Sequence, residues 1–298
     1  MAETIACPEC RSTDVTCLLS AKDHLVSGEI YMINRCRKCG LAFTVNPPPE
    51  DEIGRYYVSD EYISHSDKKR NLTDLFYHLA RSLMLGRKQR LATKVTGKRA
   101  GTLVDIGSGT GYFASFMQRR GWVVTGIELN EQAREYSRNK FAIKVVSPSE
   151  ITNIPDRSAD CITLWHVLEH LYEPGRWMND ITRILKDDGK CIIALPNLDS
   201  ADARWFGDRW AALDVPRHLW HFSPDALINF VENHGFTCNR VLPLPLDLFY
   251  ISALSFKNAG SRPALLRGLM TGILLKTGSL LRKKRASSLI YVISKQRP

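Results

Sequence analysis

The run from Leu103 to Gly111, LVDIGSGTG, restricts the possible folds of this chain more than any other part of the sequence. Its apolar first half predicts a buried strand over 102–107, and the residues after it predict a helix over 111–120. Glycines between a strand and a helix let the backbone pass close to a ligand, and the helix N-terminus favours a negatively charged group. The run therefore predicts an α/β fold with a ligand site at the carboxyl end of this strand.

Strand and helix patterns alternate through the rest of the chain, which predicts a Rossmann-like, doubly wound parallel sheet. Further strands are expected at 122–128, 143–146, 160–165, 190–195, 238–243 and 288–294. Further helices are expected at 72–95, 130–140, 173–186 and 224–234. With the first strand this makes a seven-stranded sheet.

The glycine spacing differs from that of a dinucleotide site, because Tyr112 stands where GxGxxG needs Gly or Ala. An acid, Glu128, ends the second predicted strand, 17 residues after Gly111. An acid at that place can accept hydrogen bonds from both hydroxyls of a ribose. The pair of features predicts a nucleoside-containing ligand.

The composition is that of a globular protein. Of 298 residues, 44% are hydrophobic and 24% are charged, which excludes a disordered chain, a fibrous rod and a multi-pass membrane protein. We expect three parts: a module over 1–46, a linker with N-terminal helices over 47–100, and an α/β domain over 101–298.

Four motifs resemble, in order and spacing, those of class I S-adenosylmethionine-dependent methyltransferases. They are DIGSGTGYF, GIELN, DCITLWHVLEHL and RILKDDGKCIIALPN. The resemblance covers about residues 72–240 and the strand at 288–294, and it implies the seven-stranded sheet of that class. The run DVPRHLWHFSP, from Asp214 to Pro224, resembles a subgroup with N-terminal CxxC pairs. Members of that subgroup methylate sugars and other small metabolites in glycan or secondary-metabolite pathways.

The resemblance also implies which residues bind the cofactor. Gly107, Ser108, Gly109 and Gly111 lie against its methionine half, Asp105 holds the loop, Glu128 binds the ribose and Leu129 lies against the adenine. The family often has Gly-Asp after the third strand, where this chain has Pro148, so the adenine contact passes to Ser149 or Glu150. Trp165 and His166 follow the fourth strand, where the family contacts cofactor and substrate.

Methylation of an alcohol or a carbon acid needs a base within hydrogen-bond reach of the acceptor. The candidates are histidines, and we expect His218, with His166, to do this work. In related sugar C-methyltransferases the matching stretch carries a catalytic Glu where this chain has Arg217, which argues against the same C-methylation mechanism. Arg217 instead offers a fork for a phosphate or carboxylate, or it is a surface charge.

Two CxxC pairs near the N-terminus, Cys7/Cys10 and Cys36/Cys39, have the spacing of a zinc ribbon. Four thiolates close a tetrahedral site and leave no open position, so the zinc is expected to be structural. The alternative is four free thiols in a surface hairpin. Short strands are expected at 14–19 and 29–34, with Cys17 buried in the first.

No signal peptide is evident, which favours a reducing, cytoplasmic compartment.

The net charge of +10 is concentrated in one segment. Residues 244–298 hold ten Lys and Arg and a single acid, Asp247, whereas the rest of the chain is near neutral. Within it, the insertion 244–286 is apolar and ends in four consecutive cations, 282–285. The stretch 263–285 suits a helix lying on the inner face of an anionic membrane. The alternative is a core or dimer helix with a solvated basic end.

These features favour an enzyme that methylates a small molecule, namely a sugar or a lipid-linked glycan intermediate of polysaccharide biosynthesis at the membrane surface. A quinone-like lipid is an alternative acceptor. An rRNA or tRNA methyltransferase is the other alternative, but residues 1–46 show no excess of cations, so a nucleic-acid partner is not expected. A scaffold without activity is disfavoured by the intact glycines and Glu128.

Overall fold

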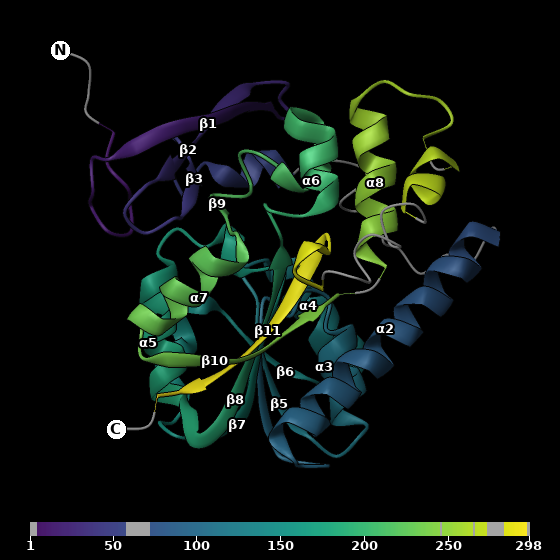
Figure 1. Cartoon of the computed structure of the whole chain (residues 1–298). Coiled ribbons are helices and arrows are strands. Elements are labelled where there is room, and N and C mark those ends of the chain that lie inside the picture. Colours follow the sequence, from purple (N-terminus) through teal and green to yellow (C-terminus); the bar gives the residue numbers. More distant parts are fainter. Residues whose placement is uncertain (1–4, 58–71, 245, 265, 273–282, 297–298) are drawn as a thin grey trace.

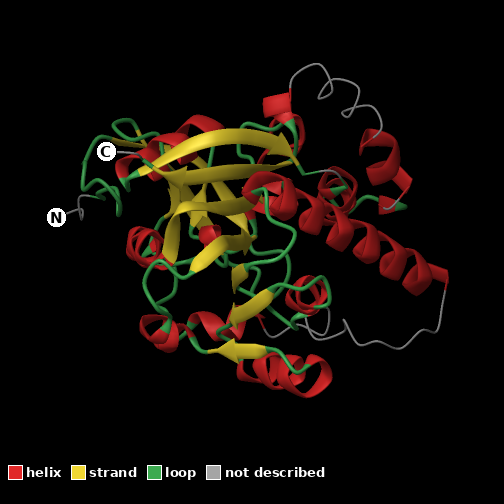
Figure 2. Ribbon diagram, turned by 90° about the horizontal axis from the view of Figure 1, so that it is seen from below, coloured by secondary structure: helices red, strands yellow, loops and turns green. Residues whose placement is uncertain are grey.

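The structure is a computed structural model that describes residues 5–57, 72–244, 246–264, 266–272 and 283–296. A seven-stranded sheet forms its centre, with helices on both faces (Figures 1 and 2). Its strands, in chain order, are β4 (Thr102–Ile106), β5 (Val123–Ile127), β6 (Lys144–Val146), β7 (Ala159–Trp165), β8 (Leu185–Pro196), β10 (Phe236–Pro243) and β11 (Ser288–Lys295).

The strand order is β10-β11-β8-β7-β4-β5-β6. The five strands from β8 to β6 run parallel to their neighbours, whereas β11 is antiparallel to both β8 and β10. The order reverses at β4, and the loop after β4 therefore opens at the switch point where ligands bind in such sheets. The doubly wound, seven-stranded fold is confirmed, with the difference that the sheet is mixed rather than wholly parallel.

The described residues form the α-helices α2 (Leu72–Thr96), α3 (Tyr112–Gln118), α4 (Glu131–Phe141), α5 (Pro174–Ile184), α6 (Ala201–Phe206), α7 (Pro224–Asn233) and α8 (Asp247–Asn258). Short 3-10 helices lie at η1 (Ile53–Tyr57), η2 (Pro148–Asn153), η3 (Leu168–His170), η4 (Gly207–Arg209), η5 (Ala211–Leu213) and η6 (Lys283–Arg285). Figure 1 shows α5 and α7 on one side of the sheet and α2 and α3 on the other.

Alternation along the strands divides the core into two layers. In β4, Val104 and Ile106 pack with the α5 and α7 side, while Leu103 packs with Ala92 of α2 and Met117 of α3. Both faces are covered, so the central strands are apolar almost throughout, as expected for parallel strands. Asp105 shares the α2 face with Leu103, and it is a buried acid in an otherwise apolar strand.

The N-terminal module forms a second, four-stranded sheet in the order β1-β2-β3-β9. Its strands are β1 (Val15–Lys22), β2 (Ile30–Cys36), β3 (Ala42–Thr44) and β9 (Trp220–His221). The two expected strands of the module are confirmed, but Cys17 is exposed rather than buried. Because β9 comes from the DVPRHLWHFSP run, the module pairs directly with the segment that carries the candidate base.

After β10 the chain forms α8 and then a helical stretch over 266–272. A side chain at Gly268 would meet the backbone of Ala253, and one at Gly272 would meet the ring of Phe249. The glycines therefore let this stretch pack closely on α8, while Leu266, Leu269 and Met270 are exposed. Part of the predicted membrane segment, 273–282, lies outside the described residues.

Among the residues that the structure describes, no helix is both long enough and apolar enough to span a bilayer.

Candidate active site

Glu128 lies directly after β5, beside the glycine loop that follows β4. Its Oε2 accepts a hydrogen bond from the backbone N–H of Gly109 at 2.8 Å, and its Oε1 accepts one from Asn130 N–H at 2.9 Å. Arg134 donates to the carbonyl oxygen of Glu128 at 2.8 Å and fixes the backbone there. The acid and the loop expected to share a ligand are therefore neighbours.

The three glycines of the loop have positive φ angles, which L side chains rarely adopt. A side chain at Gly107 would lie 2.3 Å from a methyl carbon of Val167, and one at Gly111 would lie 2.7 Å from Ser137 Oγ. No atom lies within 4 Å of the corresponding position at Gly109. Gly107 and Gly111 thus allow tight packing inside the protein, while Gly109 leaves open space above the loop.

Two buried polar atoms in this region have no hydrogen-bond partner among the described residues, namely Ser108 Oγ and Trp165 Nε1. Leu129 is 71% exposed, although it is a large apolar residue. Free polar atoms, an open loop, an acid and an exposed apolar side chain are what a nucleoside-containing ligand with a charged amino-acid end requires. The residues present therefore fit S-adenosylmethionine.

Asp105 is buried beside this loop, and the half-buried Lys88 of α2 lies near enough to influence it electrostatically. Thr163 donates a hydrogen bond to Asp105 at 2.6 Å, and burial raises the pKa of Asp105 to about 6. Lys88 reaches in from α2, with its Nζ 4.3 Å from the centre of the Trp165 ring. Burial lowers the pKa of Lys88 to about 8, with Asp105 opposing the shift. Lys88 was not predicted from the sequence, since a single cation in a helix has no pattern that marks it as functional.

Glu150 lies in η2, after β6, and is exposed. Its Oε2 accepts a hydrogen bond from Ser147 N–H at 2.8 Å, which lowers the pKa of Glu150. The carboxylate therefore caps its own short helix in this structure. A part in adenine binding stays a prediction.

His166 stands at the end of β7 with a φ of 57° and links two elements. Its Nδ1 donates to Glu169 at 3.3 Å, and its Nε2 donates to Asp247, the first residue of α8, at 3.1 Å. Burial disfavours the charged ring, but the two carboxylates raise the pKa of His166 to about 10. A ring that is protonated at neutral pH cannot accept a proton, so this geometry favours a positioning role.

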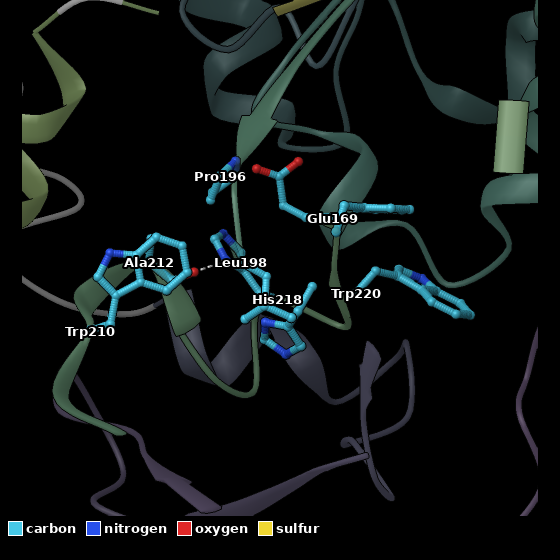
Figure 3. A pocket seen from close by; sticks show the side chains of 9 residues that line it. Glu169, Pro196, Leu198, Trp210, Ala212, His218 and Trp220 are labelled. Carbon is cyan, nitrogen blue, oxygen red and sulfur yellow. Dashed lines mark hydrogen bonds between the residues drawn. The ribbon is translucent and has the colours of Figure 1, made fainter. Parts of the chain in front are cut away.

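His218 lies at the wall of a small cavity that is also lined by Glu169, Trp210 and Trp220 (Figure 3). Its Nδ1 donates to the carbonyl oxygen of Ala212 at 2.9 Å, which leaves Nε2 as the atom that can accept a proton. The ring of His170 packs edge-on against the ring of His218, with the ring centres 4.6 Å apart. The structure thus brings His218 together with Glu169 and His170, a grouping that the sequence analysis did not predict.

Arg217 is buried and fully engaged with the protein. Its guanidinium contacts Asp23 at 2.9 Å, Asp214 at 2.7 Å and the carbonyl oxygen of Tyr56 at 2.9 Å. These contacts raise the pKa of Arg217 and connect the N-terminal module to the α/β domain. Arg217 is therefore not a surface charge, and its present partners favour a structural part over substrate binding.

The four predicted zinc ligands meet at one point. One sulfur of each lies within 4.8 Å of the others, with Cys7 Sγ 3.7 Å from Cys39 Sγ and Cys10 Sγ 3.5 Å from Cys36 Sγ. A tetrahedron with zinc–sulfur bonds of about 2.3 Å has edges of about 3.8 Å. Two of the sulfur–sulfur distances are close to that edge, so the four thiolates can hold a structural zinc ion after small side-chain shifts.

A family profile described as "Methyltransferase domain" matches residues 76–241, which is more than half of the chain. The chain belongs to this methyltransferase family. The resemblance to class I S-adenosylmethionine-dependent methyltransferases is thereby confirmed.

Relatives within the family are similar to parts of the chain. A probable S-adenosylmethionine-dependent methyltransferase of Mycobacterium tuberculosis is 26% identical over 111 residues, which are 37% of this chain and 39% of that protein. A ubiquinone biosynthesis O-methyltransferase of Alkalilimnicola ehrlichii is 28% identical over 102 residues, 32% and 41% of the two chains. A malonyl-[acyl-carrier protein] O-methyltransferase of Serratia marcescens is 25% identical over 150 residues, which are 50% of this chain and 58% of that protein. Each match therefore spans less than two thirds of the relative.

Solved methyltransferase structures share the fold. An S-adenosylmethionine-dependent methyltransferase from Archaeoglobus fulgidus superposes with a TM-score of 0.50 at 20% identity. The superposition covers 76% of this chain and 100% of the Archaeoglobus chain. A Burkholderia thailandensis 1,6-didemethyltoxoflavin-N1-methyltransferase, solved with S-adenosylhomocysteine, gives a TM-score of 0.50 at 15% identity and covers 93% and 100%. At these identities the similarity establishes the fold alone.

Proposed function

We propose that this protein transfers a methyl group from S-adenosylmethionine to a hydroxyl group of a small molecule that carries a lipid part. S-adenosylmethionine supplies an electrophilic methyl group on a sulfonium. The observation that carries the proposal is the placement of an available imidazole, His218, in a cavity of a family member whose cofactor loop, Gly109 and Glu128 are intact.

The cofactor end is proposed to be held by the residues at the switch point of the sheet. Glu128 accepts from the ribose hydroxyls, and Gly109 lets the ligand approach the backbone. Leu129 and the ring of Trp165 provide apolar contacts, and Lys88 offers a cation to the carboxylate of the amino-acid end. Positioning and exclusion of water supply much of the rate in such transfers.

The acceptor end is proposed to lie at His218. Its Nε2 can take the proton of an acceptor hydroxyl, because Nδ1 already donates to Ala212. His166 and Arg217 act as positioning residues. The named activities of several relatives, O-methylation of ubiquinone precursors and of an acyl-carrier-linked malonyl group, support oxygen as the acceptor atom.

His218→Ala tests this assignment. We expect turnover to fall at least 100-fold, because the base is removed, while the affinity for S-adenosylhomocysteine stays within about twofold of wild type. Titration calorimetry and a methyl-transfer assay provide the two measurements. A parallel loss of cofactor affinity would make His218 structural.

The lipid part of the acceptor is proposed from the apolar surface next to the site. Leu266, Leu269 and Met270 are exposed on the helix that packs against α8, and α8 begins at Asp247, which contacts His166. The segment that holds them is rich in cations. This combination suits peripheral contact with the anionic inner face of a membrane in the cytoplasm.

Flotation with liposomes tests the membrane contact. Leu269→Gln with Met270→Gln should reduce binding to anionic vesicles several-fold, whereas Leu83→Gln, which changes an equally exposed apolar residue on α2, should not. Equal flotation of all forms would refute the membrane contact and leave a water-soluble acceptor, such as a nucleotide sugar.

The class of acceptor is to be found by a turnover screen. The screen compares lipid-linked sugars, nucleotide sugars, quinol precursors and RNA. We expect the highest activity on a lipid-linked sugar and the next highest on a quinol precursor. Activity on RNA alone would overturn the proposal.

A further inference from the structure

We infer that Glu169, His170 and His218 form a binding site for a divalent transition-metal cation, separate from the four-cysteine cluster. One ligand atom of each lies within 4.8 Å of the others. Two imidazoles and a carboxylate are a common donor set for zinc and for other first-row divalent ions.

Both imidazoles are oriented as metal-binding histidines usually are. Nδ1 of His218 donates to the carbonyl oxygen of Ala212 at 2.9 Å, and Nδ1 of His170 donates to the carbonyl oxygen of Arg217 at 2.9 Å. A carbonyl only accepts, so Nδ1 of each ring carries the hydrogen and Nε2 of the neutral ring keeps its lone pair. Such second contacts fix the ring and the tautomer for coordination.

The third donor is a carboxylate oxygen without a partner. Glu169 is 1% exposed, and its Oε1 accepts from His166, but its buried Oε2 has no hydrogen-bond partner among the described residues. An unpaired, buried carboxylate oxygen is costly, and a cation is one of the few ligands that can offset that cost. His166 holds the carboxylate by its other oxygen and so aims it at the cluster.

Three protein ligands leave one position of a tetrahedral zinc open, as in catalytic rather than structural sites. Glu169 and His218 line the same cavity, so that position can face an acceptor oxygen (Figure 3). Zinc–nitrogen bonds of about 2.1 Å require ligand atoms about 3.4 Å apart, so the donors must close in by small side-chain rotations. Nε2 of His218 can serve as the base only while it coordinates no cation. With a cation bound, His218 would be a ligand, and the cation would lower the pKa of the acceptor hydroxyl, whose proton would pass to water. This role in catalysis, unlike the binding itself, rests on the proposed function.

Metal content tests the binding without any substrate. The full chain and its variants are equilibrated with a zinc buffer, desalted and measured by elemental analysis. We expect Glu169→Gln and His218→Asn each to hold one zinc per chain fewer than wild type. Glu173→Gln changes a neighbouring exposed acid and should hold as much as wild type.

Equal zinc in wild type, Glu169→Gln and His218→Asn would overturn the inference. Circular dichroism and thermal melts identify a variant that does not fold, and His218→Asn, which changes a different element, then decides the result. Because the measurement needs neither cofactor nor acceptor, a protein that loses one zinc in the variants but methylates nothing would support the metal site and refute the proposed function.

Discussion

At the scale of single residues, the carboxylate of Glu128 is firmly placed, because its two oxygens accept hydrogen bonds from the backbone N–H groups of Gly109 and Asn130 beside the proposed cofactor site. A charged acceptor contributes more than a neutral one, about 1.5–3 kcal/mol per hydrogen bond. The environments of two histidines in the DVPRHLWHFSP run set them apart. His218 lines the cavity, whereas His221 has its Nε2 hydrogen-bonded to Thr44 between β3 and β9. Burial lowers the pKa of His221 to about 3, so that ring stays neutral.

Replacing Glu128 by Ala should weaken S-adenosylhomocysteine binding by about 10- to 100-fold, because the acceptor of the ribose hydroxyls is removed. Titration calorimetry measures the change. Glu135→Gln, an exposed acid on α4, is the matched control and should leave the affinity unchanged. Wild-type affinity in Glu128→Ala would show that the ribose is held elsewhere.

At the scale of elements, two connections hold the site in shape: His166 joins the end of β7 to the start of α8, and the cysteine cluster closes the turns beside β2. Neither connection is a feature of the seven-stranded sheet itself. His166 also contacts Glu169, and β3 of the module pairs with β9; Glu169 and β9 both line the cavity proposed to take the acceptor. Loss of either connection should therefore affect this cavity before the central sheet.

The His166 connection predicts a pH-dependent stability. The pKa of His166 in the folded protein is raised to about 10, against about 6.5 in an unfolded chain. The stabilisation that the charged His166 ring gains from Asp247 and Glu169 is therefore fully present below a pH of about 6.5, and it is lost as the pH rises toward 10. The gap in unfolding free energy between wild type and His166→Gln, measured with urea, should be larger at pH 6 than at pH 9.5. For His24, an exposed histidine whose pKa is lowered by partial burial, the gap between wild type and His24→Gln should not be larger at pH 6 than at pH 9.5. A constant gap for His166→Gln would contradict the assignment.

The cysteine cluster predicts a dependence on metal. Cys36→Ser should raise hydrogen exchange in β1, β2 and β3 and destabilise the module by several kcal/mol, because structural zinc sites contribute about 10 kcal/mol or more to folding. Cys17→Ser removes an exposed thiol of the same module and should change neither. Equal exchange in both variants would show that the cluster holds no structural ion.

At the scale of the whole molecule, the module and the α/β domain share both a sheet and a buried ion pair. β9 extends the module's sheet, and Arg217 contacts Asp23 with both side chains almost fully buried. The segment that carries His218 lies between these two connections. The module therefore supports the segment of the methyltransferase domain that carries His218.

Arg217→Gln should destabilise the protein by about 3–5 kcal/mol, since it leaves Asp23 buried without its cation. Arg176→Gln breaks an exposed pair and should cost less than about 1 kcal/mol. Chemical denaturation measures both. Should Arg217→Gln keep full stability and instead raise the KM of the acceptor, Arg217 would be a substrate ligand.

The sequence by itself determined the seven strands of the central sheet, the five helices α2, α3, α4, α5 and α7, and two local clusters of residues, because glycine turns, apolar alternation and CxxC spacing act over a few residues. It did not predict α6, α8, β3 or β9. Residues 103–111 with Glu128, and the four cysteines, were found in this way. Only the tertiary structure brought Lys88 beneath Trp165, joined Arg217 to Asp23, and gathered Glu169, His170 and His218 around one cavity. Those contacts join residues far apart in the chain, and their chemistry depends on burial and on which nitrogen of each ring already has a partner, neither of which local spacing encodes.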